Sequence, residues 1–429
     1  MGGMRARPRR AYLAALGVVT GAAAACSLAA GMMQPPAAAA TTALSRSGAA
    51  PGARGAAVGA HRPAVMRPVP GVNIRHRFFS LGLHRPERVV LMRVDLAPDS
   101  GLSLDAASPG ESIGARRRTV ATLADRTGAV AGINADWFDL ESWAAVPRGA
   151  LIRDGRVLKT PQRGWAANLF VREDGTAGIG PVPFHGSVTV LDPGDRAGGR
   201  QRLGGARRER VMAVNSPSTA AHGHVVYVTH ALVHLGVHRP CAVATGRTGA
   251  SGQVITRVRT RVRHVRRIAR GRWALMSCGH AGARWIGRAL QPGTDVDVSL
   301  TFPDGRPQVA VSGGRVLIRD GLPYDDAGGQ RLQGLNPETF ACVNRAGRSV
   351  LLGVVDGRSG RSVGVTQPQL QHYLLARHCW SAMTFDGGGS STIVARPPGA
   401  SPQTPVEVLN DPSDGRPRPI ADGLYVYAR

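Results

Sequence analysis

The sequence predicts an α+β fold that is rich in strands, with mixed β-sheets and a few helices packed on them. One reason is composition: the 429 residues include 56 Gly and 30 Pro but only 8 Phe, 6 Tyr and 6 Trp, which favours short strands and turns over long helices. Another is that short β-branched runs recur between turn residues, with only brief helical patterns among them. Because 43% of the residues are hydrophobic, the chain can bury a sizeable core.

The first elements expected along the chain alternate between strands and a short helix. They are a strand at 88–96, a helix at 119–127, a strand at 129–133 and a hairpin at 147–158. The hairpin is indicated by Asp154-Gly155, because an Asp-Gly pair between apolar runs favours a tight turn.

The last third of the chain has the clearest pattern. A hairpin is expected at 340–344 and 349–355, then a helix from Thr366, then a buried strand at 381–385. Thr366 and Gln369 have the spacing of a capping box. The second and last of these strands are each followed by an aspartate and glycines, so polar groups are expected at two carboxyl ends.

The first 68 residues differ in composition from the rest. Arginines precede an apolar, Ala-rich run, which is typical of a secretory signal peptide, predicted here at residues 1–40. Arg9-Arg10 is compatible with twin-arginine export as well as the general secretory route, whereas a lipid anchor at Cys26 and an uncleaved membrane anchor remain alternatives. Residues 41–68 are predicted to be a flexible Ala/Gly/Pro linker, and residues 69–429 the folded domain.

The formal net charge of +26 raises the question of an anionic partner. Lys159 is the only lysine, and the arginines are scattered along the chain rather than clustered. This distribution does not favour a nucleic-acid binder, which needs a concentrated cationic surface. Electrostatic association with an anionic cell envelope is the partner that the charge favours.

Four cysteines follow the predicted signal peptide: Cys241, Cys278, Cys342 and Cys379. In an exported protein they meet an oxidising compartment, where four cysteines permit three disulfide pairings. Sequence order favours Cys241 with Cys278 and Cys342 with Cys379. No CxxC pair is present, so the sequence predicts no zinc site, and it indicates no other metal or cofactor.

The principal candidate site begins where the strand 381–385 ends. Asp386 is followed by Gly387, Gly388, Gly389, Ser390 and Ser391. Glycines let backbone amides approach a ligand closely, and amides followed by hydroxyls suit an anionic or polyhydroxylated group. A tight turn without a ligand is the alternative interpretation.

Polar residues at other strand ends extend this candidate site. Asn134 and Asp136 follow the strand 129–133, and Asp356, Arg358 and Ser362 follow the strand 349–355. Asn134 can instead cap an Asx turn, and Asp356 can instead cap its hairpin.

Four motifs occur in the order found in phosphodiester glycosidases, and the chain resembles that family over about residues 85–429. They are Asn336-Pro337-Glu338-Thr339, Val355-Asp356-Gly357-Arg358, Ser362-Val363-Gly364-Val365-Thr366 and Phe385-Asp386-Gly387-Gly388-Gly389-Ser390-Ser391. The family includes the enzyme that uncovers mannose 6-phosphate by removing N-acetylglucosamine from a phosphodiester. The resemblance implies a hydrolase that acts on a glycosyl phosphodiester.

Two positions depart from the family pattern. Glu338 stands where the family usually has arginine, and Ala135 where it usually has glycine. If Glu338 lines the phosphate site, its charge should repel a dianion, unless the substrate carries less phosphate charge or a cation such as Arg331 or Arg361 compensates.

The chemistry of a sugar-1-phosphodiester assigns roles to the candidate residues. Asp386 is the leading catalytic carboxylate, with Asp356 or Asp136 second, because a carboxylate can stabilise or attack an oxocarbenium-like state. Arg358 is a phosphate clamp, Gly387–Ser391 a donor loop, and Asn134 and Ser362 further substrate ligands. The expected partner is a phosphorylated glycan or sugar-1-phosphodiester.

Two functions follow from these residues. The first is a secreted glycosidase that cleaves a sugar-1-phosphodiester bond in a glycoconjugate or envelope polysaccharide. The alternative is a catalytically inactive envelope polysaccharide binding or assembly protein of the same fold, which the change at Glu338 would permit.

Overall fold

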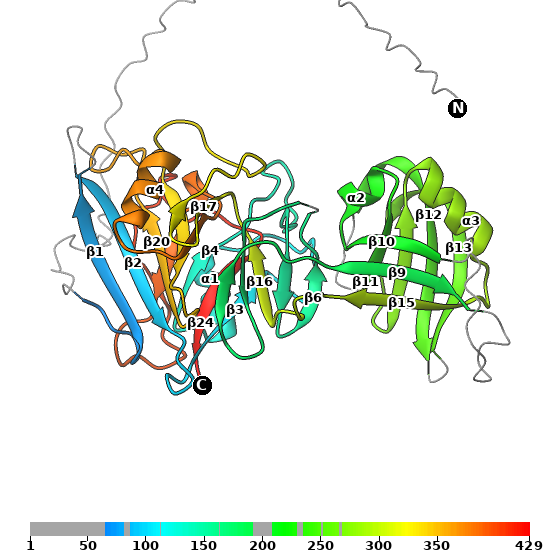
Figure 1. Cartoon of the computed structure of the whole chain (residues 1–429), viewed down its shortest axis with the longest axis horizontal. Coiled ribbons are helices and arrows are strands. Elements are labelled where there is room, and N and C mark those ends of the chain that lie inside the picture. Colours follow the sequence, from blue (N-terminus) through cyan, green and yellow to red (C-terminus); the bar gives the residue numbers. More distant parts are fainter. Residues whose placement is uncertain are drawn as a thin grey trace, which may run out of the picture. The chain divides into compact units, whose positions relative to one another are not determined.

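The computed structural model describes residues 65–80, 86–111, 113–162, 164–191, 208–229, 235–249, 252–265 and 268–429. The predicted α+β class is confirmed, since four sheets carry most of the described chain and four α-helices accompany them (Figure 1). The sheets are mixed: β10 (Arg208–Val214) pairs in parallel with β11 (Val225–Thr229), and the other described strand pairs are antiparallel. Short strands and turns therefore dominate, as the glycine and proline content predicts.

The predicted signal peptide, residues 1–40, and the linker up to residue 64 lie outside the described residues. The last residues assigned to the linker already join the fold, because Met66 exchanges two backbone hydrogen bonds with Ile74. Within the described part of the chain, no helix is long and apolar enough to cross a membrane.

A seven-stranded antiparallel sheet carries the motifs of the last third. Its spatial order is β1, β2, β20, β19, β21, β17, β18. The strands are β1 (Val72–Phe79), β2 (Glu87–Asp95), β17 (Val316–Arg319), β18 (Leu322–Pro323), β19 (Glu338–Val343), β20 (Ser349–Val355) and β21 (Ser381–Thr384). The predicted hairpin is β19–β20, and the two strands that end in aspartates are β20 and β21, with β19 between them.

Two five-stranded antiparallel sheets pack with it. One has the order β23, β22, β4, β24, β3, and the other β6, β5, β16, β7, β8. The strands of the first are β3 (Leu102–Ala107), β4 (Ala131–Asn134), β22 (Ile393–Ala395), β23 (Glu407–Val408) and β24 (Gly423–Ala428). Those of the second are β5 (Leu151–Arg153), β6 (Arg156–Lys159), β7 (Asn168–Val171), β8 (Ala177–Ile179) and β16 (Val309–Ser312). The predicted Asp154-Gly155 turn joins β5 to β6, and both of its residues have positive φ.

The fourth sheet is a closed barrel, which the sequence pattern does not predict. Besides β10 and β11 it contains β9 (His185–Val190), β12 (Leu235–Gly249), β13 (Gly252–Val265), β14 (Arg272–Ser277) and β15 (Asp295–Thr301). The helices α2 (Pro217–Ala221) and α3 (His280–Ala289) lie within the same stretch of sequence. The barrel has an apolar interior of its own, in which Val188, Ile255 and Leu275 are buried together.

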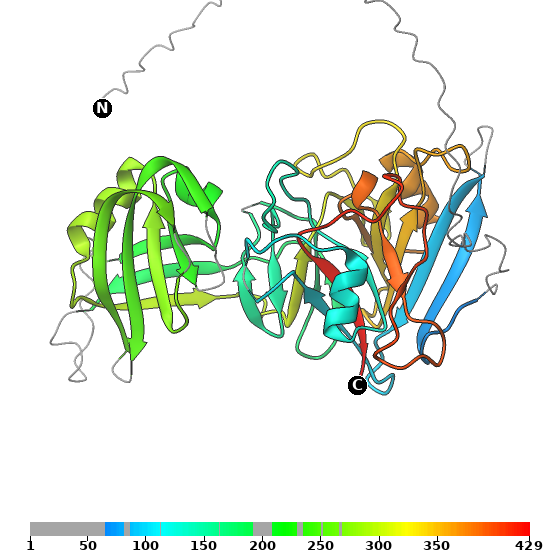
Figure 2. The ribbon, with the colours of Figure 1, turned by 180° about the vertical axis from the view of Figure 1, so that it is seen from behind.

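Both predicted helices form where the capping residues indicate. In α1 (Val120–Thr127) the Thr119 side chain caps the first turn, and the buried side covers the sheet of β4 and β22 (Figure 2). In α4 (Gln367–Leu375) the Thr366 and Gln369 side chains form the predicted capping box. Apolar residues of α4 pack on the seven-stranded sheet.

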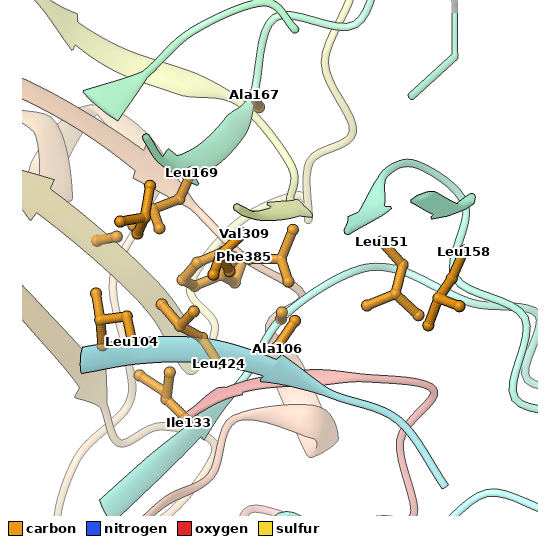
Figure 3. Close-up of a cluster of buried hydrophobic side chains, with 14 of the residues drawn as sticks. Leu104, Ala106, Ile133, Leu151, Leu158, Ala167, Leu169, Val309, Phe385 and Leu424 are labelled. Carbon is orange, nitrogen blue, oxygen red and sulfur yellow. The ribbon is translucent and has the colours of Figure 1, made fainter. Parts of the chain in front are cut away.

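The central core lies between the seven-stranded sheet and the two five-stranded sheets. Figure 3 shows Phe385 within a cluster of buried side chains that includes Leu169 and Val309 of one sheet and Ile133 and Leu424 of the other. Phe385 is completely buried, so the residue before the candidate carboxylate is fixed by packing from several strands.

Both predicted disulfide pairings form: Cys241 with Cys278, and Cys342 with Cys379. The second disulfide connects β19 to the segment between α4 and β21. It therefore ties together the strands that carry the candidate site.

We expect the purified exported protein to contain no free thiol among these four cysteines. Both disulfides close loops with a sequence separation of 37 residues, so each should contribute about 3 to 4 kcal/mol to the free energy of unfolding in the chain-entropy model. Peptide mapping under non-reducing conditions and urea unfolding of the Cys342→Ala/Cys379→Ala variant measure the two claims. Alkylation of all four cysteines in the native protein would contradict the pairing.

Candidate active site

Three acidic residues meet at one edge of the seven-stranded sheet. Because β20 and β21 both pair antiparallel with β19, their carboxyl ends lie at the edge where β19 begins. Asp356 follows β20, Asp386 follows β21 after Phe385, and Glu338 is the first residue of β19. Strand order therefore places Glu338 between the two predicted aspartates.

The backbone around Asp386 is held from two sheets. The Phe385 amide donates to the Thr339 carbonyl oxygen at 2.7 Å, and the Asp386 amide donates to the Ala135 carbonyl oxygen at 2.8 Å. Ala135 is completely buried in the core, so the methyl group that replaces the family's glycine is accommodated there. Asp386 consequently has little freedom to shift.

Asn134 is a connector beneath this loop. Its side-chain Nδ2 donates to the Asp386 carbonyl oxygen at 2.7 Å, and its Oδ1 accepts from the Thr339 hydroxyl and the Thr392 amide, each at 3.0 Å. The Thr339 hydroxyl also lies 3.0 Å from the Ser391 hydroxyl. Because Asn134 is 1% exposed and its amide group is engaged at both ends, these contacts favour positioning of the loop over direct contact with a ligand.

The Asp386 carboxyl group is nearly removed from water, with 7% of the residue exposed. Burial raises its pKa to about 7, and the negative charge of Asp136 adds to this rise. The neighbouring Ser390 and the cations Arg418 and Arg148 act in the opposite direction and lower the pKa. Asp386 therefore gains and loses its proton near neutral pH, the range in which a catalytic carboxylate is useful.

The glycine loop passes close to several charged side chains. A Cβ atom on Gly387 would lie 3.3 Å from Glu338 Oε2, and one on Gly388 would lie 3.1 Å from an Arg358 guanidinium nitrogen. Gly388 also has a φ of 61°, in the left-handed region that glycine adopts readily. A Cβ on Gly389 would overlap Arg418, so the glycines permit the approach of the surrounding side chains.

The loop folds into a short turn rather than extending. Residues Gly388–Ser390 form a 3₁₀ turn, and the Gly388 amide donates to the Pro337 carbonyl oxygen at 2.9 Å. Among the described residues, the amides of Gly387 and Gly389 have no acceptor, and the buried Ser390 hydroxyl lies beside the Asp386 carboxyl group. These are the donors that the loop can offer to a ligand.

Arg358 is exposed, and its guanidinium group lies next to Gly388 of this loop. Its guanidinium group donates from Nε and Nη2 to Asn336 Oδ1, at 3.1 and 2.6 Å, which leaves further N–H groups for a ligand. The backbone of Arg358 has a φ of 58°, which is uncommon for a residue other than glycine. This geometry suits the predicted clamp on an anionic group.

Asp136 belongs to a buried network beside the site. Its Oδ1 accepts from the Trp137 amide at 2.8 Å, its Oδ2 accepts from the Gly149 amide, and its own amide donates to Asp422 Oδ1 at 2.9 Å. Burial raises the pKa of Asp136 to about 6 and that of Asp422 well above its usual value, while it lowers the pKa of Lys159 to about 8. Asp136 thus acts on Asp386 through its charge.

Asp356 and Ser362 lie in a separate set of contacts. The Asp356 carboxylate accepts from the Asp411 amide at 2.9 Å and lies 3.5 Å from Arg88 Nε. The Ser362 hydroxyl contacts Glu87 Oε2 at 2.6 Å and the Asp356 carbonyl oxygen at 2.8 Å. These interactions hold the loop that presents Arg358, and Asp356 is not among the charges that shift the pKa of Asp386.

The sequence model of the phosphodiester glycosidase family matches residues 243–427. Over this stretch the chain is similar to a phosphodiester glycosidase domain. The resemblance stated from the motifs is thereby confirmed, and the matched stretch includes Glu338, Arg358, Asp386 and the glycine loop. Asn134, Asp136 and Lys159 precede it.

Solved structures with the fold of this chain are distant in sequence. A hypothetical protein from Synechocystis has a TM-score of 0.68 at 16% identity, over 86% of this chain and 65% of its own length. A Burkholderia pseudomallei protein described as exported has a TM-score of 0.59 at 21% identity, over 80% of this chain and 74% of its own. The catalytic domain of zebrafish N-acetylglucosamine-1-phosphodiester alpha-N-acetylglucosaminidase, auto-inhibited by its pro-peptide, has a TM-score of 0.43 at 15% identity, over 87% of each chain. A comparison with curated proteins gives no match.

Three residues of the site are not expected from the sequence. Lys159 is the single lysine of the chain and is 2% exposed, yet its Nζ donates to the Arg148 and Gly149 carbonyl oxygens. Asp422 and Arg418 come from the C-terminal segment. The unusual lysine was a signal in the sequence, but nothing local placed these residues near Asp386.

Among the described residues, no group of three or more His, Cys, Asp or Glu side chains has the arrangement of a metal site. The acidic residues at the sheet edge are instead accompanied by Arg358, Arg418 and Lys159. Their interactions with one another set the electrostatics of the site.

The raised pKa of Asp386 makes a prediction about stability. Between the unfolded value near 3.8 and the folded value of about 7, the folded protein holds the proton more tightly, so this group lowers stability as pH rises through that window. Asp386→Asn should therefore raise the free energy of unfolding at pH 8, by about 2 to 4 kcal/mol, with the gain shrinking toward pH 4. Urea unfolding at the two pH values measures the difference.

The exposed Asp139 supplies the matched control. Asp139→Asn should change stability little at either pH. An Asp386→Asn effect of equal size at pH 4 and pH 8 would show that burial does not raise the pKa of Asp386.

Proposed function

We propose that this chain is a secreted glycosidase that hydrolyses a sugar-1-phosphodiester bond in a glycoconjugate or envelope polysaccharide. The observation that carries the proposal is the buried Asp386 carboxyl group, with a pKa of about 7, beside Arg358, Arg418 and the unused amides of the glycine loop. A carboxylate faces the developing positive charge in such a site, while cations and amides face the phosphate.

In the proposed reaction the bond between the anomeric carbon and the phosphate oxygen breaks. Water supplies the new hydroxyl group on the sugar, and the phosphodiester leaves as a phosphate monoester, which keeps the bonding electrons. Because the second pKa of a phosphate monoester is about 6, the leaving group needs little help from a general acid. One ionised aspartate with donors on the phosphate can therefore provide the main stabilisation.

The ionised form of Asp386 is the active form in this scheme. Above a pH of about 7 the carboxylate predominates and can stabilise or attack the oxocarbenium-like carbon. Arg358 binds the phosphate from the rim, and the amides of Gly387 and Gly389 bind from the loop. Asn134, Ser362 and Asp356 hold these groups in place, and Asp136 helps to raise the pKa of Asp386.

The two disulfides support secretion as part of this proposal, since such bonds persist in oxidising compartments. The net charge of +26 supports electrostatic association with an anionic cell envelope, where a phosphorylated glycan would be the partner. The predicted signal peptide would deliver the chain there.

A specific observation favours a second candidate, an inactive envelope polysaccharide binding or assembly protein. Glu338 replaces the family's arginine and lies against the glycine loop, at 2% exposure, so the change falls within the site. An inactive binder would retain affinity for the glycan without releasing sugar. Turnover therefore separates the two candidates.

The decisive experiment incubates the mature domain with a panel of sugar-1-phosphodiesters and measures released sugar. We expect release with at least one member, a kcat/KM that rises with pH up to about 7, and a loss of at least about a hundredfold in Asp386→Asn. Asp139→Asn serves as the control for the loss of a surface charge.

Near-parental turnover by a folded Asp386→Asn protein would remove Asp386 from the catalytic role. Tight glycan binding with no sugar released from any panel member would instead favour the binding protein.

A further inference from the structure

Glu338 is a buried acid that the reaction described above does not use. It is 2% exposed, and its carboxyl group makes no hydrogen bond and no ion pair with the part of the chain that the structure describes. Its Oε2 lies against Gly387, at the loop whose amides have no acceptor. Its carboxyl group is therefore placed to contact a ligand that the glycine loop binds.

Two charged side chains act on Glu338, one from each neighbouring strand end. Asp386, after β21, disfavours the ionised form, and Arg358, after β20, favours it. The remaining neighbours of the Gly387 position are the Pro337 carbonyl oxygen and the Leu332 side chain, which carry no charge. Arg358 donates to Asn336 Oδ1, and its charge acts on Glu338 without a direct ion pair among the described residues.

Burial and the Asp386 charge together raise the pKa of Glu338 well above its usual value. When two carboxyl groups lie close together out of water, one ionises and the other keeps its proton. Asp386, which Arg418 and Arg148 help to ionise, is the group that loses its proton first. Glu338 then carries the only acidic O–H of the pair.

We propose that Glu338 binds the phosphodiester group of the substrate as a neutral carboxylic acid, its O–H donating a hydrogen bond to a non-bridging phosphate oxygen. The inference rests on the substrate class of the proposed function and names how that class is recognised. The proton stays on Glu338, and no bond is broken in this contact.

This role removes the repulsion expected from the sequence. A neutral acid does not repel phosphate, so neither Arg331 nor Arg361 has to compensate for a negative charge at this position. The neutral Glu338 side chain donates one hydrogen bond to the phosphate, whereas an arginine at this position would add a full positive charge. The site then suits a singly charged phosphodiester better than a terminal phosphate, which is largely dianionic above a pH of about 6.

The experiment measures binding rather than turnover. Isothermal titration calorimetry is carried out from pH 6 to pH 9.5 with non-hydrolysable analogues of the 1-(methyl phosphate) diesters of glucose, mannose and N-acetylglucosamine, in which carbon replaces the bridging oxygen on the sugar. The parental protein should lose affinity by about tenfold or more as pH rises and Glu338 ionises, because a donor becomes a repelling charge. Glu338→Gln keeps a neutral donor at every pH and should show affinity within about threefold of the parental value at pH 6, with no alkaline loss.

A second variant tests the electrostatic link. In Asp386→Asn the negative charge that keeps Glu338 protonated is absent, so the alkaline loss of affinity should move to lower pH. Glu407→Gln, on the exposed edge strand β23, is the matched control and should follow the parental curve. This measurement stands even if Glu338→Gln fails to fold, since the parental protein and Asp386→Asn carry it.

An alkaline loss of the same size in the parental protein and in folded Glu338→Gln would overturn the proposal, as would a parental affinity that does not change with pH. Absence of binding by all three analogues would overturn it together with the proposed substrate class. Binding with the expected pH dependence but without turnover on the panel would support this role of Glu338 while removing the glycosidase function.

Discussion

The electrostatics of this site depend on one constraint: two acidic residues are held near each other and out of water. Glu338 begins β19, and Asp386 follows the end of the neighbouring strand β21. Antiparallel pairing fixes this arrangement, because β19 begins at the edge where β21 ends. Neither group can turn into solvent, since both residues lie at the buried base of the glycine loop. Burial raises the pKa of both carboxyl groups, and the charge of Asp386 raises that of Glu338 further.

The scaffold that maintains this pair consists mainly of uncharged contacts. Phe385 is buried where the three packed sheets meet, and Asn134 connects the Asp386 backbone to β19 and to the chain after the glycine loop. A buried amide suits this position because it donates and accepts without adding charge. Replacing it with a charged group would impose a further desolvation cost beside two acids. Uncharged contacts thus fix the positions of the two acidic residues without adding charge beside them.

The sequence predicts the local features of this fold, but it does not predict which distant segments come into contact. The capping box of Thr366 and Gln369, the Asp154-Gly155 turn and the β19–β20 hairpin involve residues close in sequence, and all three form as expected. The position of Asp386 at a strand end was likewise visible, because glycines after an apolar run mark the end of a strand. The closed barrel was missed, since its short strands resemble those of an open sheet until their pairing is known. Lys159 is distinctive in the sequence as the only lysine, but its place beside Asp136 and Asp422 depends on three segments that are distant in sequence.

The charges around the glycine loop also explain how a glutamate can occupy a position that the family gives to a cation. Arg418 is paired with Asp414 at 2.7 Å, so much of its charge is already balanced. With Asp386 and Asp136 ionised and Glu338 and Asp422 neutral, the cations Arg358, Arg148 and Lys159 outnumber the two carboxylates by one charge. The region near the loop then keeps a modest excess of positive charge, which matches one phosphodiester anion. Were Glu338 ionised as well, that excess would vanish, and two adjacent carboxylates would face the same phosphate. The protonation of one residue therefore decides whether this arrangement of strands can hold a phosphodiester.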